Sequence, residues 1–533
     1  MLSSNRSAFH HSLTPNPFRY PLKPDPTDPD VTPQASSSYG QILKSSSIIG
    51  GAQGINYLIG MVRTKLVAVL LGPSGVGLVG LYVTATSLVG SLTGLGIGAS
   101  GVREVAEAHG SGDVERVART VKTLRRACWA TGLLGWMLTI ALAYPLSLWT
   151  FGSGKRAMAV ALLGATLLLS SISGGQTALL QGTRRIGDLA RLNVVSVLAS
   201  TVVAVSLYAW IGEQAIVPVL ISTALVNLGF SWWFARRVQI IPIDMGWIET
   251  WGNSKRLIGL GLSFMWSGLL IGAVGLATRS LIVKNLGLDA NGIYQAAWGI
   301  SGMFAGFVLG AMGTDFYPRL TAVAHDDAQV NRLVNEQTEI GILLALPGLL
   351  GTLAFAPWIM HVFYSARFLA GADLLPWFVL GIFGRVVSLP LGYILLAKGA
   401  SRWFAVTETA SSAVLLGLTV LLLRAFGLWG VALAFAVLYA LYCLGMVVLT
   451  RHLTGFFWSP AAIRLLIVAS VLVAIGFATQ RWIPGIIGLA TGSVVTVVSC
   501  LFTLRGVASR LGPEHSIVKY VCRIPWGRLA CGI

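Results

Sequence analysis

Two cationic side chains, Arg63 and Lys65, lie inside the first long apolar segment of the sequence. This segment runs from Ser46 to Leu71, and its 26 residues are enough for an α-helix to cross the roughly 30 Å core of a bilayer. An arginine near the middle of such a helix costs about 2.5–3.5 kcal/mol on insertion scales, so it is expected to face a polar cavity. The segment therefore predicts a functional site inside a membrane.

A polar stripe accompanies Arg63. Gln53, Asn56, Gly60 and Arg63 are spaced by three, four and three positions, which places them on one face of an α-helix. Lys65 lies about 200° around the helix from Arg63, nearer the outer end, where it reaches either the ligand or the lipid headgroups. We predict that Gln53, Asn56, Arg63 and Lys65 contribute to substrate binding.

The pattern around Arg63 returns in the second half of the chain. Matching residues are separated by 215 to 217 positions, which indicates an internal repeat of one membrane unit. The matching pairs are Arg63 and Arg279, Gly72 and Gly287, Gly77 and Gly292, Gly212 and Gly427, and the dipeptides Gln181-Gly182 and Lys398-Gly399. The second unit therefore carries its own intramembrane arginine.

A glycine stripe precedes Arg279. Gly268, Gly272 and Gly275 share one helix face with this arginine, which indicates either close helix packing or a cavity wall. We predict that Arg279 lines the same cavity as Arg63.

Two more charged residues lie within apolar segments. Arg385 is near the middle of its segment, and the neighbouring Pro390 and Gly392 can kink the helix and free backbone polar groups. It is predicted either to bind substrate or to pair with a buried acid. Glu408 in the next segment is predicted to be either an ion-coupling carboxylate or the salt-bridge partner of Arg385.

The composition sets the class of protein. Of 533 residues, 55% are hydrophobic and 11% are charged, against about 25% charged in soluble proteins. The net charge of +18 gathers in short loops on one side, which is typical of membrane topology and does not indicate a nucleic-acid partner. Five widely spaced cysteines predict no metal site, and the lack of a Gly-x-x-x-x-Gly-Lys-Ser/Thr loop argues against ATP hydrolysis. We expect no cofactor.

Fourteen apolar segments follow a polar amino-terminal tail. With the amino terminus inside, 27 of the 38 Lys and Arg fall on the inner side, six fall outside, and five lie within segments, so both termini are predicted to be cytoplasmic. Arg464, one of these five, is near the end of its segment and is expected to snorkel. The segments are 46–71, 76–100, 127–150, 157–180, 193–211, 214–235, 258–283, 291–314, 339–364, 373–397, 403–423, 427–450, 461–480 and 482–504.

These segments predict an all-α polytopic membrane protein with about 14 transmembrane helices. The first unit holds an even number of segments, so the second enters the membrane in the same direction and the two repeats are parallel. The expected division is a disordered cytoplasmic tail (1–44), a six-helix bundle (45–238), a cytoplasmic linker (239–257), a second six-helix bundle (258–452), two peripheral helices (453–505) and a cytoplasmic tail (506–533).

Several motifs resemble a known superfamily. They are Arg63-x8-Gly72-x4-Gly77, the stretch Gly292–Ser301, the stretch Asp315–Leu320 and the stretch Phe426–Ala434. Together with the parallel repeat they resemble the multidrug/oligosaccharidyl-lipid/polysaccharide (MOP) exporters, and within them the polysaccharide-transporter branch that includes O-antigen translocases.

The resemblance implies two bundles forming a V around a central cavity in the bacterial inner membrane. It implies a flippase whose substrate is a polyprenyl-diphosphate-linked oligosaccharide, an O-antigen or exopolysaccharide repeat unit, with membrane lipids and other polysaccharide assembly proteins as further partners. Arg63, Arg279 and Arg385 would hold the diphosphate, because arginine binds phosphate through two parallel hydrogen bonds. Gln53 and Asn56 would bind phosphate or sugar.

Two alternatives remain. A multidrug or cation antiporter of the same superfamily would need carboxylates in the bundles, whereas the candidate cavity residues here are cations. A polytopic polysaccharide polymerase or ligase would need an acid–base cluster and a larger outer loop, and the sequence offers neither. The chain is therefore not expected to be an enzyme.

Overall fold

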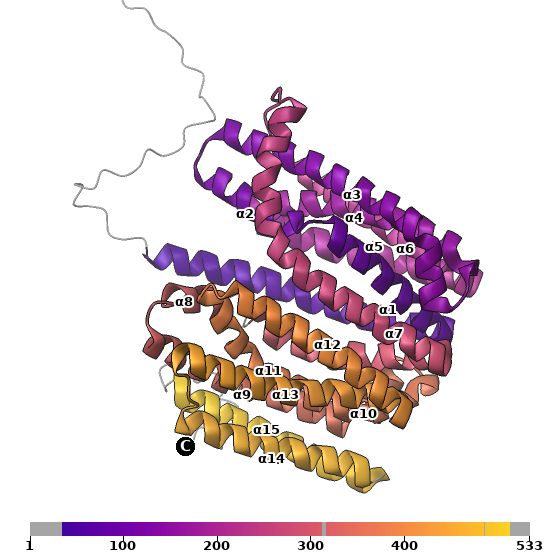
Figure 1. Cartoon of the computed structure of the whole chain (residues 1–533), viewed down its shortest axis with the longest axis vertical. Helices are drawn as coiled ribbons and strands as arrows, with labels where there is room; N and C mark the ends of the chain where they lie inside the picture. Colours follow the sequence, from indigo (N-terminus) through magenta and orange to yellow (C-terminus); the bar gives the residue numbers. More distant parts are fainter. Residues whose placement is uncertain (1–34, 312–315, 484, 512–533) are drawn as a thin grey trace, which may run out of the picture.

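The protein is a stack of long, roughly aligned helices (Figure 1). The computed structural model describes residues 35–311, 316–483 and 485–511, and within these ranges it contains helices and no β-strand. The longer helices are α1 (Ala35–Thr93), α3 (Val114–Phe151), α4 (Ala157–Gly182), α5 (Ile186–Ile211), α6 (Ile216–Ala235), α7 (Trp247–Ala311), α9 (Asp327–Ala354), α11 (Leu375–Ala397), α12 (Ser401–Phe426), α13 (Leu428–Thr454), α14 (Pro460–Trp482) and α15 (Gly485–Leu511). Shorter ones are α2 (Ile97–Gly110), α8 (Tyr317–Ala322) and α10 (Ala356–Phe363).

The described helices confirm a polytopic membrane protein. Eleven helical stretches are long and apolar enough to cross a bilayer. Three of these contain a break that divides them into two crossings: Gln53–Thr93 at Gly72, Ile186–Ala235 at Gly212, and Met265–Met303 at Gly287. The described part of the chain therefore offers fourteen crossings, as the sequence predicts.

The amino-terminal boundary differs from the expected one. Helix α1 begins at Ala35, inside the segment expected to be a disordered tail, while residues 1–34 and 512–533 lie outside the described part. The division into bundles, linker and peripheral helices remains a prediction.

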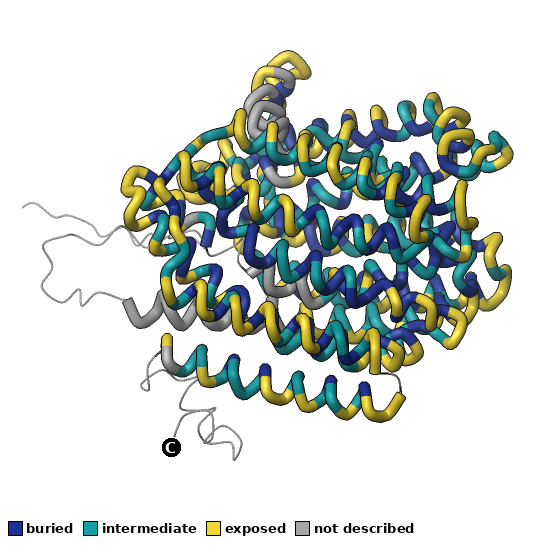
Figure 2. The backbone as a smooth tube through the Cα atoms, turned by 60° about the horizontal axis from the view of Figure 1, so that its bottom comes forward, coloured by how far each residue is buried: buried dark blue, intermediate teal, exposed yellow. Residues whose placement is uncertain are grey.

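The two halves of the chain lie on opposite sides of α1 and α7. In Figure 1, α2 to α6 lie in the upper part and α8 to α15 in the lower part, while α7 runs from the top of the picture, beside α2 and α3, down to α1 in the middle. Helices α14 and α15 pack along α9 at the lower edge. Exposed residues line the outer faces of the helices, while buried residues face their neighbours (Figure 2). Because exposed positions include many large apolar side chains, such as Leu444 at 67% and Val448 at 70% exposure, these outer faces fit lipid better than water.

The repeat is visible in the backbone. Gly72 (φ 65°, ψ −172°) and Gly287 (φ 87°, ψ 177°) break α1 and α7 in the same unusual conformation, which only glycine adopts readily. Gly212 (φ 65°, ψ −136°) and Gly427 (φ 63°, ψ −145°) form a second matched pair. Both pairs are 215 positions apart, so the spacing found in the sequence corresponds to repeated structure.

A third matched turn differs from the predicted pairing of Gly182 with Gly399. The left-handed residue that corresponds to Gly399 (φ 68°) is Arg184 (φ 55°), 215 positions earlier. The backbone hydrogen bonds around the two turns are the same: the amides of Arg184 and Gly399 each donate to the carbonyl three residues before, and the next amides each donate to the carbonyl five residues before. The first copy keeps the turn without a glycine, which is why matching glycines misplaced it.

The breaks at Gly72 and Gly287 bring the two repeats together. We call residues 72–77 and 287–292 the paired turns. The Asn291 amide donates to the Gly77 carbonyl at 2.7 Å, and this side chain is fully buried. A Cβ on Gly77 would lie 2.5 Å from the Leu288 carbonyl oxygen, and a Cβ on Gly292 would overlap the Pro73 carbonyl oxygen. The paired turns therefore meet backbone to backbone, and the glycines permit it.

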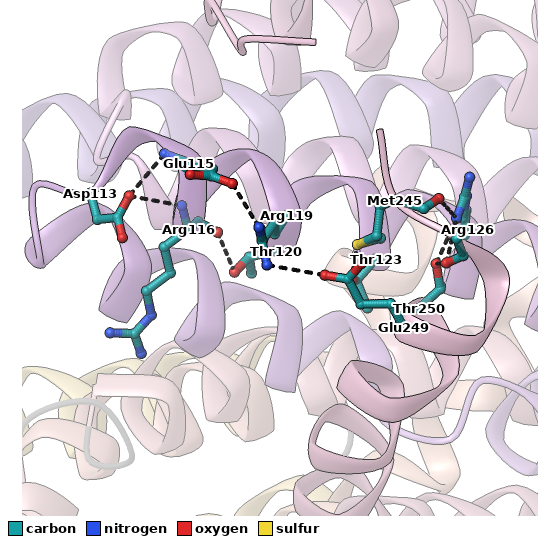
Figure 3. A network of polar contacts seen from close by, with 11 residues as sticks. Asp113, Glu115, Arg116, Arg119, Thr120, Thr123, Arg126, Met245, Glu249 and Thr250 are labelled. Atoms are coloured by element: carbon teal, nitrogen blue, oxygen red, sulfur yellow. Dashed lines mark hydrogen bonds and ion pairs between the residues drawn. The ribbon is translucent and has the colours of Figure 1, made fainter. Parts of the chain in front are cut away.

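The segment that connects the two repeats is bound to the amino-terminal part of α3, which is predicted to lie on the cytoplasmic side (Figure 3). The Arg126 guanidinium donates to the Met245 carbonyl at 2.9 Å and to Thr250 Oγ1 at 2.6 Å, and it lies 4.6 Å from the Trp247 ring centroid. Arg119 forms an ion pair with Glu249 at 3.2 Å. The start of α7, which lies in the predicted linker, is thus fixed to the first repeat.

Replacing Arg126 with leucine is expected to loosen this connection. Hydrogen bonds that involve a charged donor contribute about 1.5–3 kcal/mol each, so local opening near Trp247 should become about tenfold more frequent, or more. The measurement is the rate of chymotrypsin cleavage at Trp247 in purified protein. Arg125→Leu is the matched control, because Arg125 is exposed and no hydrogen bond or ion pair described for this network involves it. Equal cleavage of both variants would show that the network does not hold the linker.

Candidate functional site

A polar cavity of about 400 Å³ lies within the first repeat, and Arg63 forms part of its wall. Helices α1, α4, α5 and α6 surround it, and Arg63 is the charged residue among the described residues of its lining. The polar remainder of the wall is made of hydroxyl and amide groups. They are Thr86, Thr166, Ser170, Asn193, Ser196, Ser200, Thr223 and Asn227.

Two hydroxyl groups of this wall have unmet hydrogen-bonding capacity. Ser196 Oγ and Thr223 Oγ1 are buried and have no hydrogen-bond partner among the described residues. Buried polar atoms in native proteins nearly always have a partner, which for a cavity wall is water or ligand. The cavity is therefore suited to a hydrated or hydroxyl-bearing anionic group.

The stripe that leads to Arg63 faces open space. A Cβ on Gly60 would have no heavy atom within 4 Å, and Gln53, further along the stripe, is exposed. Asn56 is half-buried, and its Oδ1 atom is buried without a partner in the described structure. This face of α1 is thus open at Gln53 and Gly60 but covered at the Asn56 Oδ1 atom, and it presents amide groups on the approach to the arginine.

Lys65 is placed elsewhere. Its Nζ donates to the His361 carbonyl at 2.6 Å, near the carboxyl end of α10. The last carbonyls of a helix carry partial negative charge, so this is a favourable place for a cation. Lys65 therefore links α1 to the second half of the molecule instead of lining the cavity that contains Arg63.

Arg279 is almost completely buried, with 7% exposure. Its guanidinium lies 5.4 Å from the centroid of the Tyr294 ring, and its Nη1 is 3.0 Å from where a Cβ of Gly80 would be. Gln295 Oε1 is 2.9 Å from the same point. Arg279 thus lies where the second half of α1 meets both halves of α7, and it is not part of the wall around Arg63.

The glycine stripe before Arg279 is a packing surface. Cβ atoms on Gly268 and Gly272 would lie 3.3 Å from Ser91 Oγ and 3.2 Å from Leu88 Cα. The first half of α7 therefore packs closely on the second half of α1, whereas the matching stripe of the first repeat is open. Two similar sequence patterns have different environments here.

Arg385 and Glu408 belong to a third polar group in the second repeat. The Arg385 guanidinium lies 5.9 Å from the Tyr439 ring centroid, and Glu408 is within its electrostatic range. Glu408 Oε2 accepts a long hydrogen bond of 3.4 Å from Ser267 Oγ of α7. No ion pair joins Glu408 to Arg385 among the described residues, and coupling of Glu408 to an ion stays a prediction.

The structure thus places the three arginines in three separate environments and Lys65 in a fourth, and none of the three arginines shares an ion pair with an acid in the described chain. Sequence reasoning missed the hydroxyl and amide groups of the cavity wall. Asn227 was the available signal, because an amide in the middle of an apolar segment needs a polar environment.

A second cavity of about 480 Å³ lies between α12 and α13. Its lining is mainly apolar and includes the exposed residues Leu441 and Val448, with His452 near the end of α13. It is a lipid-facing groove rather than a polar site.

Comparison with known proteins gives one family match. The model of a family described as polysaccharide biosynthesis protein matches residues 42–324, more than half of the chain. The chain is 24% identical over 406 residues to a protein named lipid III flippase from Escherichia coli (strain K12), an alignment that covers 74% of this chain and 95% of the relative.

Solved structures of transporters resemble this fold, and two of them illustrate the likeness. One is the lipid II flippase MurJ in an inward closed conformation, with a TM-score of 0.64 and 11% identity over 87% of this chain and 99% of that one. The other is a multidrug resistance MATE family transporter of the MOP superfamily in an inward-facing conformation, with a TM-score of 0.61 and 14% identity over 75% and 94% of the two chains. At these identities the likeness establishes the fold.

Proposed function

Because this chain belongs to the polysaccharide biosynthesis protein family and has a MOP-type fold, we propose that it is a flippase for a lipid-linked oligosaccharide. The proposed cargo is an oligosaccharide joined to a polyprenyl lipid through a diphosphate, as in an O-antigen or exopolysaccharide repeat unit. The cargo crosses the inner membrane unchanged, so the protein acts as a transporter and not as an enzyme.

The observation that carries the proposal is the chemistry of the cavity around Arg63. One guanidinium surrounded by hydroxyl and amide groups can bind a phosphate and sugar hydroxyls at the same time. A site for a cationic drug would instead need a carboxylate. The relative named lipid III flippase covers most of the chain and supports the same class of cargo.

The remaining predicted residues receive roles in this proposal. Gln53 and Asn56 guide the polar headgroup along the open stripe of α1 toward Arg63. Arg385 provides a cation in the second repeat, and Glu408 responds to the coupling ion or to Arg385. The lipid tail stays in the bilayer while the two repeats rock against each other, as in other transporters built from repeats.

Ligand specificity tests this function. Purified protein should be stabilised against thermal unfolding by a polyprenyl diphosphate carrying a sugar, because a ligand at about 100 times its dissociation constant adds about 2.7 kcal/mol to the free energy of unfolding. A lipophilic cation such as ethidium should add little. The reverse order of stabilisation would favour the multidrug antiporter and contradict the proposal.

The proposal places both termini in the cytoplasm and the paired turns on the outer side. A cysteine at the exposed position Asp289 should react with an impermeant thiol reagent added to intact spheroplasts, whereas one at the exposed position Ser111 should react only after lysis. Both substitutions are made in a background without the five native cysteines. The opposite pattern would invert the topology.

A further inference from the structure

The Arg279 side chain is buried, and part of its hydrogen-bonding capacity is not used. It is 7% exposed, and its Nη1 has no hydrogen-bond partner among the described residues. Gln295 Oε1, close to the same point above Gly80, is also buried without a partner. An unpaired charge held away from water is unfavourable in any fold, and polar groups inside membrane proteins are by default functional. The pair resembles a ligand site from which the ligand is excluded.

The paired turns account for the exclusion. Gly80 follows residues 72–77 in α1, and Gln295 follows residues 287–292 in α7, so both lie next to these turns along their helices. The turns are joined by the hydrogen bond from Asn291 to Gly77, and Lys65 bonds to His361 across the same two halves of the molecule. As long as these contacts hold, the second half of α1 covers the Arg279 guanidinium.

Arg63 has the opposite accessibility. It is partly exposed and lines an open cavity, while its repeat mate is covered. Two equivalent cations therefore differ in access within one conformation. Separation of the paired turns would move Gly80 away from Arg279 and Gln295 and free both side chains to bind.

We propose that Arg279 and Gln295 form a second binding station for the cargo's diphosphate, which becomes available only when the paired turns separate. The inference rests on the proposed function and adds an order of events: the diphosphate binds first at Arg63, and Arg279 takes it when the outer side opens. The guanidinium donates two hydrogen bonds to phosphate oxygens, and the amide nitrogen of Gln295 donates a third, while Gln295 Oε1, which can only accept, takes a hydrogen bond from a sugar hydroxyl of the cargo.

This arrangement makes the anion itself favour outward opening. A ligand shifts a conformational equilibrium only by its difference in affinity for the two states. When the paired turns are closed, Arg279 is covered and has no ion-pair partner among the described residues. A diphosphate can therefore bind Arg279 only in the outward-open state. Removing the Arg279 charge should therefore weaken opening while leaving the first binding step intact.

The test uses a polyprenyl diphosphate with full-length protein in nanodiscs. Spin labels at Lys155, an exposed position in the connection between α3 and α4, and at Asp289, an exposed position in the second of the paired turns, report the separation of the outer side. In wild type the diphosphate should increase the population with the longer distance.

In Arg279→Met the affinity for the diphosphate should stay within about twofold of wild type. The effect of the diphosphate on the distance should vanish, and transport should fall at least tenfold. In Gln295→Leu the affinity should also stay near wild type, and the effect of the diphosphate on the distance should be smaller than in wild type. In Arg279→Lys this effect should be larger than in Arg279→Met.

Three results contradict the inference. If the diphosphate increases the distance in Arg279→Met as much as in wild type, Arg279 has a structural role only. Loss of affinity in Arg279→Met as large as in Arg63→Gln would place both arginines in one station. If Arg279→Met does not fold, the same criteria apply to Gln295→Leu. Wild type that neither binds nor responds to the diphosphate would instead overturn the proposed function, and this inference with it.

Discussion

Replacing Arg63 with glutamine is expected to reduce transport of the lipid-linked oligosaccharide by about a hundredfold. Losing a charged partner of a desolvated anion costs about 2–5 kcal/mol, and about 2.7 kcal/mol corresponds to a hundredfold. The surrounding hydroxyl and amide groups remain in Arg63→Gln, so the cavity keeps its shape and polarity. The measurement is the initial rate of transport into proteoliposomes that contain equal amounts of protein.

Arg464→Gln is the matched control for this effect. Arg464 also lies within an apolar helix, but it is exposed on α14 and its Nε donates to the Pro460 carbonyl of the same helix. Its replacement should leave transport within about twofold of wild type, since exposed charges contribute little. Two outcomes would contradict the role of Arg63: normal transport in Arg63→Gln, or its disappearance from the membrane while Arg464→Gln is normal.

Replacing Gly292 with alanine is expected to prevent the paired turns from closing. A Cβ at this position would overlap the Pro73 carbonyl oxygen, and neither backbone can move without separating the two turns. Overpacking at a rigid contact costs about 1–3 kcal/mol or more, which is sufficient to shift a two-state equilibrium by about fivefold to 150-fold. The variant should occupy the outward-open state and transport at less than about a tenth of the wild-type rate.

Labelling of a cysteine introduced at Ser74 measures this change, because this position in the first turn is partly covered when the turns are closed. Labelling by an impermeant reagent should accelerate in Gly292→Ala. Gly302→Ala in the same helix is the control, because a Cβ there meets no heavy atom within 4 Å and alanine favours the helix. Unchanged labelling and transport in Gly292→Ala would show that the turns need not meet for the transport cycle.

The fold could largely be predicted from the sequence because a membrane restricts it strongly. Apolar segments must become helices when their backbone groups have no water to bond, so length and hydrophobicity identify the crossings. The repeat was equally visible, since Gly72 and Gly287 occupy backbone conformations that few other residues adopt. Arg184 shows the limit of this reasoning, because it makes the same turn as Gly399 with a different residue type.

The environment of each arginine could not be predicted in the same way. Arg63 and Arg279 are equivalent in sequence, but the cavity wall near one comes from α4 to α6, and the cover over the other comes from the second half of α1. A transporter in one conformation cannot keep two parallel repeats equivalent, because one side of the molecule is closed. The two arginines have different environments because of the way helices distant in the sequence pack around them. The spacing of apolar and polar residues along one helix does not predict this packing.

In the proposed function, the protein moves a lipid-linked oligosaccharide across a bilayer without altering it. The most direct measurement uses liposomes with a polyprenyl-diphosphate oligosaccharide in both leaflets, and follows the fraction that an added, impermeant glycosidase can reach. With the protein present, this fraction should rise from about half to nearly all, because cargo from the inner leaflet reaches the outer one. The cargo that remains uncleaved should keep its mass. A fraction that stays at the value of protein-free liposomes, or a change in the mass of the cargo before glycosidase is added, would show that the protein is not a flippase for this cargo.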